Sequence, residues 1–147
     1  MTTDPLAFEF FNEVGIIDQL TTAMLTNALP RGMTKAQFTV LNHFVRLEIT
    51  EKSPADLASA FQVRRPTITS TLARMESAGL VAIRVDPKDG RAKLVSITAE
   101  GRAMRERCVT ALQAMIPDIE TIVTASEMQS LLPALRKIRV GLDALRD

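Results

Sequence analysis

Apolar side chains recur at helical spacing through most of this chain. In its centre, Ile68, Leu72 and Met75 follow the pattern i, i+4, i+7, and the preceding segment 54–61 has one apolar face. Residues 81–85 instead alternate between large apolar side chains and other residues, which is typical of a strand with one buried face. The pattern therefore predicts a mainly α-helical fold that contains a small β-hairpin.

Helix-capping residues give the boundaries of the predicted helices. Thr34 and Ser126 each open a capping box, Ser53 precedes a proline, and Thr98 precedes a first turn that contains a glutamate. These signals predict helices over roughly 5–28, 35–48, 54–61, 65–78, 99–124 and 127–145.

A hairpin with a basic tip is predicted around the sequence RVDPKDGRAKLVSIT, residues 84–98. Residues 81–85 and 93–98 form its strands, and 86–90 supply turn-forming Asp, Pro and Gly, with Gly90 able to take a positive φ. The cations around this turn are Arg84, Lys88, Arg91 and Lys93. Such a tip is suited to contact a phosphate backbone.

The two central helices are interpreted as a helix-turn-helix. Residues 61–64 leave room only for a tight turn, and the small Ala58 allows the helices to cross closely. The second helix then presents hydroxyl and guanidinium groups to solvent, and these groups can bind phosphates or base edges in the major groove of DNA. They belong to Arg65, Thr67, Thr69, Ser70 and Arg74. The hairpin that follows is interpreted as a wing, which can reach the backbone or the minor groove.

Positive charge is concentrated in this central region. The chain of 147 residues has a formal net charge of +1, but residues 61–93 contain seven basic and three acidic side chains, and the remainder is net acidic. This distribution is typical of a protein that binds a polyanion through one face. The alternative is chance clustering of solvated charges.

The sequence lacks the residue patterns of an enzyme or a metal site. Cys108 is the single cysteine, so no internal disulfide can form, and the single histidine, His43, has no cluster of metal ligands around it. There is no phosphate-binding glycine loop and no long apolar run. We therefore expect no catalysis, no cofactor, no metal and no membrane partner. The absence of a leader pattern predicts a cytoplasmic location.

Three sequence motifs follow one another along the chain: MTKAQFTVL, LASAFQVRRPTITSTLARMESAGLV and DGRAKLVSITAEG. The last contains Asp-x-Arg, at Asp89 and Arg91, and then an apolar run that ends in Thr-x-x-Gly, at Thr98 and Gly101. In these features the chain resembles the multiple-antibiotic-resistance regulator (MarR) family of winged helix-turn-helix transcription factors. The resemblance implies a winged helix-turn-helix core with N- and C-terminal dimerisation helices.

The resemblance assigns roles to residues of the helix and the wing. It implies that Arg91 enters the minor groove, held by an ion pair with Asp89, and that the second central helix binds the major groove. With the neighbouring cations, the predicted DNA-binding residues are Arg64, Arg65, Pro66, Thr67, Thr69, Ser70, Arg74, Arg84, Lys88, Asp89, Arg91 and Lys93. Ser70, Ile83 and Gly90 stand where the family often carries arginine, so the operator sequence cannot be copied from relatives.

Both ends of the chain carry apolar stripes beyond those of the central core. The stripes comprise Phe10, Val14, Ile17, Thr21, Met24 and Ala28 at one end, and Leu131, Leu135, Ile138, Leu142 and Leu145 at the other. Each stripe needs a partner, and the two ends could pack against each other. The family resemblance instead implies a homodimer in which 1–33 and 99–147 form the dimerisation region and 34–98 binds DNA. Two-fold symmetry then predicts a pseudo-palindromic operator. A repressor is expected because occupancy of a promoter-sized site blocks polymerase. Kinks are expected at Pro117 and Pro133.

The sequence leaves the control of DNA binding open. The resemblance implies a small aromatic or phenolic ligand that lowers DNA affinity. Its pocket could be lined by Phe38, His43, Phe44 and Met104, although apolar helical residues are usually core. Cys108 could act as a redox sensor, but an inert, partly buried thiol fits its place inside a helix better. A winged helix that binds a protein instead of DNA is the other alternative.

Overall fold

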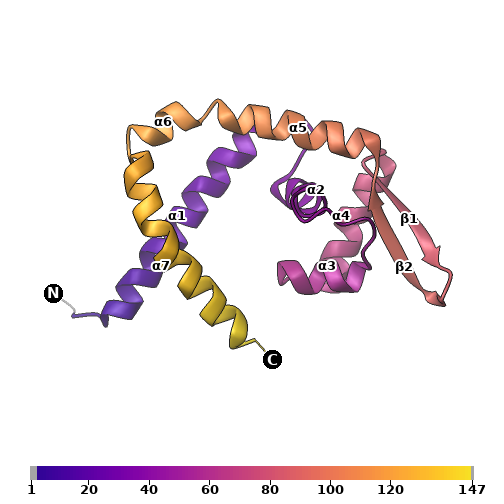
Figure 1. The fold of residues 1–147 in the computed structure, drawn as a ribbon, viewed down its shortest axis with the longest axis horizontal. Helices are drawn as coiled ribbons and strands as arrows, with labels where there is room; N and C mark the ends of the chain where they lie inside the picture. The colour runs from indigo at the N-terminus through magenta and orange to yellow at the C-terminus, as the bar shows by residue number, and fades with distance from the viewer. Residues whose placement is uncertain (1–2, 147) are drawn as a thin grey trace. The chain divides into compact units, whose positions relative to one another are not determined.

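The computed structural model describes residues 3–146, which form helices and one hairpin (Figure 1). The helices are α1 (Leu6–Ala28), α2 (Lys35–Arg46), α3 (Pro54–Phe61), α4 (Arg65–Ser77), α5 (Ala99–Gln113), α6 (Ile116–Glu120) and α7 (Ala125–Ala144), and the strands are β1 (Val81–Asp86) and β2 (Asp89–Ile97). The chain divides into two compact units between Leu112 and Gln113. The predicted fold class is confirmed, whereas the predicted division into dimerisation and DNA-binding regions stays a prediction.

Side-chain caps begin the helices that carry the site. Thr34 and Gln37 form the predicted capping box of α2, in which each backbone N–H donates to the other's side-chain oxygen at 3.2 Å. The hydroxyl of Ser53 accepts the N–H of Asp56 at 3.1 Å and begins α3. Gln62 then takes a left-handed conformation, with φ of 54°, which ends α3 and makes the turn into α4 tight.

The core of the first unit lies where α2, α3, α4, the hairpin and α5 meet. The predicted apolar face of α4 is confirmed, because Ile68, Leu72 and Met75 are all buried. They pack in one cluster with Val40, Leu41, Phe44, Leu57, Ala58, Val81, Val95 and Cys108. This packing fixes which side of α4 remains in solvent.

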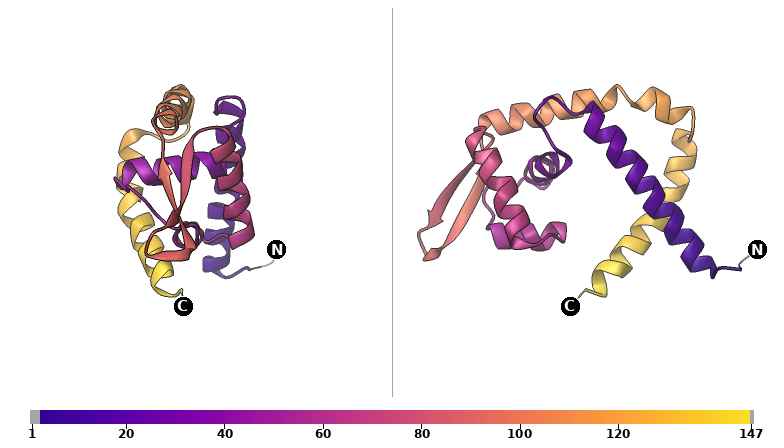
Figure 2. Two further views of the ribbon diagram at one scale, coloured as in Figure 1. Left: turned by 90° about the vertical axis from the view of Figure 1, so that its right-hand side faces the viewer. Right: turned by 180° about the vertical axis from the view of Figure 1, so that it is seen from behind.

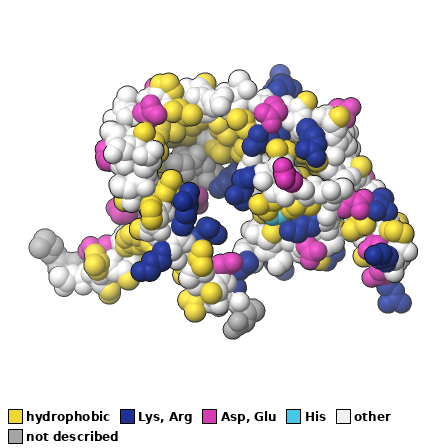
Figure 3. All heavy atoms as spheres, in the orientation of Figure 1, with side chains coloured by type: hydrophobic (Ala, Val, Ile, Leu, Met, Phe, Trp, Pro, Cys, Tyr) yellow, Lys and Arg dark blue, Asp and Glu magenta, His cyan; other side chains and the backbone are white. Residues whose placement is uncertain are grey.

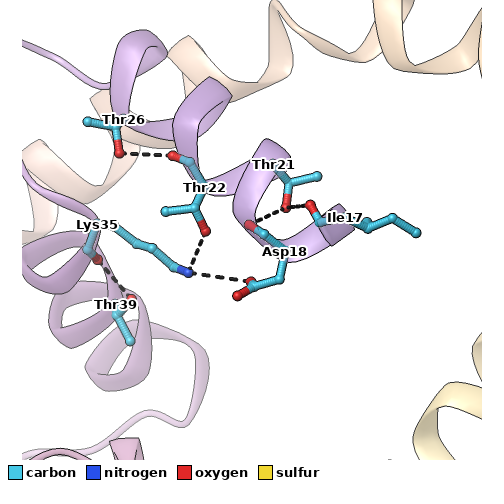
Figure 4. Close-up of polar contacts among 7 residues, drawn as sticks. All are labelled: Ile17, Asp18, Thr21, Thr22, Thr26, Lys35 and Thr39. Atoms are coloured by element: carbon cyan, nitrogen blue, oxygen red, sulfur yellow. Dashed lines mark hydrogen bonds and ion pairs between the residues drawn. The ribbon is translucent and has the colours of Figure 1, made fainter. Parts of the chain in front are cut away.

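The last turns of α1 are attached to α2 by polar contacts (Figure 4). The ammonium group of Lys35 donates to the Thr22 hydroxyl at 2.9 Å and lies 3.7 Å from the Asp18 carboxylate. Leu25 packs against the core, and Leu29, just after α1, is buried. No residue of α1 itself is buried, so most of its apolar surface is left without a partner within the unit.

The hairpin has a tighter turn than the sequence predicts. Asp86 pairs with Asp89, so only two residues form the turn, and β2 begins at Asp89 rather than at Lys93. Among the described glycines, positive φ occurs at Gly32 and Gly79, and the expectation for Gly90 was wrong. The register shifts between Val85 and Asp86, which leaves residues 90–92 without partners on β1 and forms a bulge next to the tip.

Thr98 joins the base of the hairpin to the helices on either side of it. Its hydroxyl donates to the carbonyl oxygen of Gly79, just beyond α4, and accepts the N–H of Gly101 at 3.0 Å in the first turn of α5. The predicted cap at Thr98 is therefore confirmed. Gly101 is buried, and a Cβ at this position would meet the carbonyl oxygen of Leu80.

The predicted helix over 99–124 is two helices. α5 ends at Gln113, and Pro117 lies in the first turn of α6, where its missing N–H breaks no helical hydrogen bond. Thr124, not Ser126, caps α7 and shares a capping box with Glu127. Pro133 lies inside α7, which continues to Ala144. None of the helices in the described part of the chain has the length and apolar character that crossing a membrane requires.

Candidate nucleic-acid interface

The solvent face of α4 carries the residues that are predicted to contact the major groove of DNA. Arg64, Arg65, Pro66, Thr67, Thr69, Ser70 and Arg74 are all exposed. Arg64 occupies the N-cap position without a side-chain hydrogen bond, and proline lies in the first turn. The backbone donors of this first turn are therefore not occupied by a cap, and a phosphate group is a suitable acceptor for such donors.

The two flanks of α4 border different hollows. On one flank, Thr67 and Thr71 line a cleft of about 460 Å³, together with Ile68 and residues of α2 and the α3–α4 turn. The remaining lining residues are Lys35, Ala36, Thr39, Phe61 and Val63. Since Thr71 donates to the carbonyl oxygen of Thr67 at 3.1 Å, its hydroxyl hydrogen is already used. Because Thr67 lines this cleft and not the groove on the hairpin side, it lies on the flank of α4 that borders α2.

The other flank of α4 faces the hairpin. Thr69, Leu72, Ala73 and Glu76 line a groove of about 320 Å³ with Ile83, Arg84, Val85 and Lys93. Both views of Figure 2 show α4 and the hairpin side by side. The recognition helix and the wing therefore contribute to one continuous surface.

Short polar contacts shape the tip of the hairpin. The carboxylate of Asp86 accepts the N–H of Lys88 at 2.9 Å, and the carboxylate of Asp89 accepts the N–H of Arg91 at 3.0 Å. The expected ion pair between the Asp89 and Arg91 side chains is absent, because Asp89 turns back onto the backbone instead. Lys88, Asp89, Arg91 and Lys93 are exposed. Basic atoms gather with acidic ones at the free end of the hairpin in Figure 3.

Arg84 differs from the other predicted cations because its guanidinium group is already engaged. Its Nε donates to Oε1 of Glu51 at 2.7 Å, and its second nitrogen donates to Oε2 at 2.8 Å. These hydrogen bonds lower the pKa of Glu51. Glu51 was not predicted as part of the site, because its partner is 33 residues away along the chain and no local spacing signals the pair.

His43 packs at the edge of the core, between α2 and the segment before α3. Its ring meets Phe61 edge-to-face at 4.9 Å, and its Nε2 lies 3.2 Å from the ammonium group of Lys52. Burial, and then the positive charges of Lys52 and Arg46, lower the pKa of His43. Phe44 is a core residue, and Phe38 and Met104 pack against the core, so the interpretation of these three as core is confirmed.

Cys108 is buried on α5 and has no disulfide partner. Burial raises the pKa of its thiol, and Arg107 opposes this only in part. A buried thiol with a raised pKa reacts slowly with oxidants. Among the described residues, no group of His, Cys, Asp and Glu is placed to hold a metal ion.

Comparison with known proteins gives the same family in sequence and in fold. A family model described as MarR family matches residues 31–92. The homoprotocatechuate degradative operon repressor of Escherichia coli is 38% identical over 90 residues, which cover 58% of this chain. The chain spans 60% of the length of that curated relative.

Solved structures agree over nearly the whole chain. A mutant of E. coli MarR complexed with operator DNA is 27% identical, with a TM-score of 0.76, and the match covers 92% of this chain and 99% of the other. The regulator BldR of Sulfolobus solfataricus shares the fold, with a TM-score of 0.80 at 23% identity and coverage of 95% and 99%. The fold and the exposed helix define a winged helix-turn-helix protein. The chain is similar to the MarR family in sequence over residues 31–92 and in fold over most of its length.

Proposed function

We propose that this protein is a transcriptional regulator that binds double-stranded DNA, with α4 in the major groove and the hairpin tip at the minor groove. The observation that carries the proposal is the shared groove, lined by Thr69 and Ala73 from α4 and by Val85 and Lys93 from the hairpin. Hydroxyl and cationic groups on one such surface suit the base edges and phosphates of one duplex.

The proposed interface contains the predicted residues in three groups. The α4 group is Arg64, Arg65, Pro66, Thr67, Thr69, Ser70 and Arg74, and the wing group is Lys88, Asp89, Arg91 and Lys93. In this proposal Asp89 fixes the backbone of Arg91, while the bulge at residues 90–92 directs Arg91 outward. Arg84, the third group, is held by Glu51, so its direct contact with DNA stays a prediction.

A homodimer that represses transcription is part of the proposal. The supporting observation is exposed apolar surface: Phe10 and Ile17 on α1 are 43% and 56% exposed, and Leu131 and Leu135 on α7 are 54% and 48% exposed. Burying such stripes against a second copy removes them from water. The dimer would bind a pseudo-palindromic operator and exclude polymerase. The repressor activity named for the E. coli relative is consistent with this role.

The finer aspects of this function are proposed on weaker grounds. The family resemblance supports a small aromatic or phenolic ligand, while the patterns of the sequence support a cytoplasmic location and the absence of enzymatic activity; all three are predictions. The cleft beside α4 is of a size that suits small ligands, but its lining does not include Phe38, His43, Phe44 or Met104.

Electrophoretic titration against a pool of random duplexes at two salt concentrations tests the proposal. A DNA-binding protein loses affinity steeply as salt rises, because bound cations release counterions from the duplex. Repeated selection from the same pool then isolates a tight-binding duplex, which is expected to be pseudo-palindromic. Weak binding at both salt concentrations would instead favour the alternative, a winged helix that binds a protein.

A further inference from the structure

We propose that Glu51 is a positioning residue for DNA binding, because it clamps the wing to the segment that precedes the helix-turn-helix. The inference rests on the proposed function of the wing. The clamp consists of Glu51 and Arg84, whose two side chains meet through parallel hydrogen bonds of 2.7 and 2.8 Å. A planar guanidinium group bound at two points to one carboxylate fixes orientation as well as distance.

The clamp spans a small three-stranded arrangement at the base of the wing. Lys52 pairs with Val95 of β2: the N–H of Lys52 donates to the Val95 carbonyl oxygen at 3.0 Å, and the N–H of Val95 donates to the Lys52 carbonyl oxygen at 2.9 Å. Val95 pairs in turn with Ile83 of β1. β2 therefore lies between β1 and the segment that holds Glu51, and the ion pair crosses over it.

The alternation of side chains separates Arg84 from the face that packs on the core. Val95 is buried and Ile83 packs against the core, so both point inward. Arg84, which follows Ile83, lies on the outer face of the hairpin, and Glu51, which precedes Lys52, lies on the same face. The guanidinium group of Arg84 is thus directed toward Glu51, across β2, although Arg84 is also among the residues that line the groove beside α4.

This geometry explains how the wing keeps its position beside α4. A two-stranded hairpin on its own is only marginally stable. The clamp and the Lys52–Val95 pairing attach its base to the residues that lead into α3. Loss of the clamp would let the wing swing relative to α4, so that Arg91 and the α4 face no longer meet one duplex together.

Glu51→Gln, Arg84→Ala and the double variant Glu51→Ala/Arg84→Ala test the clamp, with the duplex obtained by selection. A clamp predicts that each single variant binds about three- to tenfold more weakly, and that the double variant is no worse than Arg84→Ala, because both changes break one interaction. The salt dependence of binding is expected to stay the same in all three. Glu48→Gln, at an exposed position just after α2, is the control for the lost negative charge.

The opposite pattern would overturn the proposal. If Arg84 binds phosphate directly, Arg84→Ala lowers the salt slope by about one, and Glu51→Gln strengthens binding because it frees a cation. Amide hydrogen exchange of Lys52 and Val95 tests the clamp without DNA: Glu51→Gln must accelerate exchange at these positions while circular dichroism stays that of the parent protein. Unchanged exchange would refute the clamp, whereas failure of the parent protein to bind any duplex would refute only the proposed function.

Discussion

Arg91 is the residue of the wing whose guanidinium group is free for a ligand, since no described acidic side chain pairs with it and Asp89 binds its backbone instead. Arg91→Ala is expected to weaken binding to the selected duplex by about 1–3 kcal/mol if Arg91 contacts base edges. The measurement is titration of both proteins at one salt concentration. Arg102→Ala, which removes an exposed cation from α5, should have no such effect. Equal affinity of Arg91→Ala and the parent protein would remove Arg91 from the interface.

Gly101 and Gly141 offer a matched pair of substitutions in helices. A Cβ at Gly101 would meet the backbone carbonyl of Leu80 and lie 2.8 Å from Cγ1 of Ile97, so Gly101→Ala should destabilise the fold by about 1–3 kcal/mol. Gly141 has no atom within 4 Å of such a Cβ, and Gly141→Ala should stabilise α7 by about 0.5–1 kcal/mol. Urea unfolding of both variants measures the two free energies. A neutral effect of Gly101→Ala would mean that the junction at Leu80 is looser than described.

Single residues were predictable from sequence where a repeating pattern placed them. The spacing of Ile68, Leu72 and Met75 identified the buried face of α4 and, by exclusion, its solvent face. The partners of Asp89 and Glu51 were not predictable, because a carboxylate chooses between a nearby N–H and a distant guanidinium group only once the turn and the strands are in place. Side-chain partners far apart in sequence leave no periodic signal.

At the scale of elements, His43 couples α2 to the segment before α3 and gives that contact a dependence on pH. Its pKa in the folded protein lies below 6.5, the unfolded value, so at acidic pH the folded state binds fewer protons than the unfolded state. The contribution of neutral His43 to the free energy of unfolding is fully present above pH 6.5, and it is lost as the pH falls through the lowered pKa of the folded protein. The free energy of unfolding in urea should therefore be smaller at pH 5.5 than at pH 7.5.

His43→Gln provides the control for this pH dependence. His43 is the only histidine of the chain, so the variant should flatten the profile between pH 7.5 and 5.5. The glutamine amide oxygen can still accept a hydrogen bond from Lys52. A profile as steep as that of the parent protein would place the titrating group elsewhere.

Element boundaries were predictable where capping chemistry was local. Thr34 and Ser53 set the starts of α2 and α3 as expected. The break between α5 and α6 was missed, because proline is accepted in a first turn as well as at a kink, and sequence does not distinguish the two cases at Pro117. The shorter turn of the hairpin was also missed. Asp86 pairs directly with Asp89, so the turn does not use Gly90 in a positive-φ conformation, and the turn-forming residues 86–90 do not show which of them pair.

At the scale of the whole molecule, the proposed dimer predicts a change in mass on substitution. Sedimentation should give about 32 kDa for the parent protein, twice the 16.2 kDa of the chain, and Leu135→Glu should shift the equilibrium toward 16.2 kDa because a charge would be buried at the interface. Gln129→Glu adds the same charge on the opposite side of α7 and should remain dimeric. A monomeric parent protein would refute the dimer, and with it the pseudo-palindromic operator.

The order of elements and the resemblance to the MarR family could be predicted from the sequence, because the motifs are contiguous and most helix starts have a capping signal. The assembly could not be predicted, because the apolar stripes on α1 and α7 indicate only that this surface must be covered. One chain cannot specify whether a second copy, a ligand or its own other end covers it.

The hydroxyl group of Thr98 serves as both donor and acceptor, toward Gly79 after α4 and Gly101 in α5. One oxygen atom therefore joins the end of α4, the base of the hairpin and the first turn of α5. The hydrogen bonds of Thr98 connect the start of α5 to the hairpin and also to Gly79, just beyond α4. A displacement of the first turn of α5 is therefore expected to move the end of α4 together with the base of the hairpin.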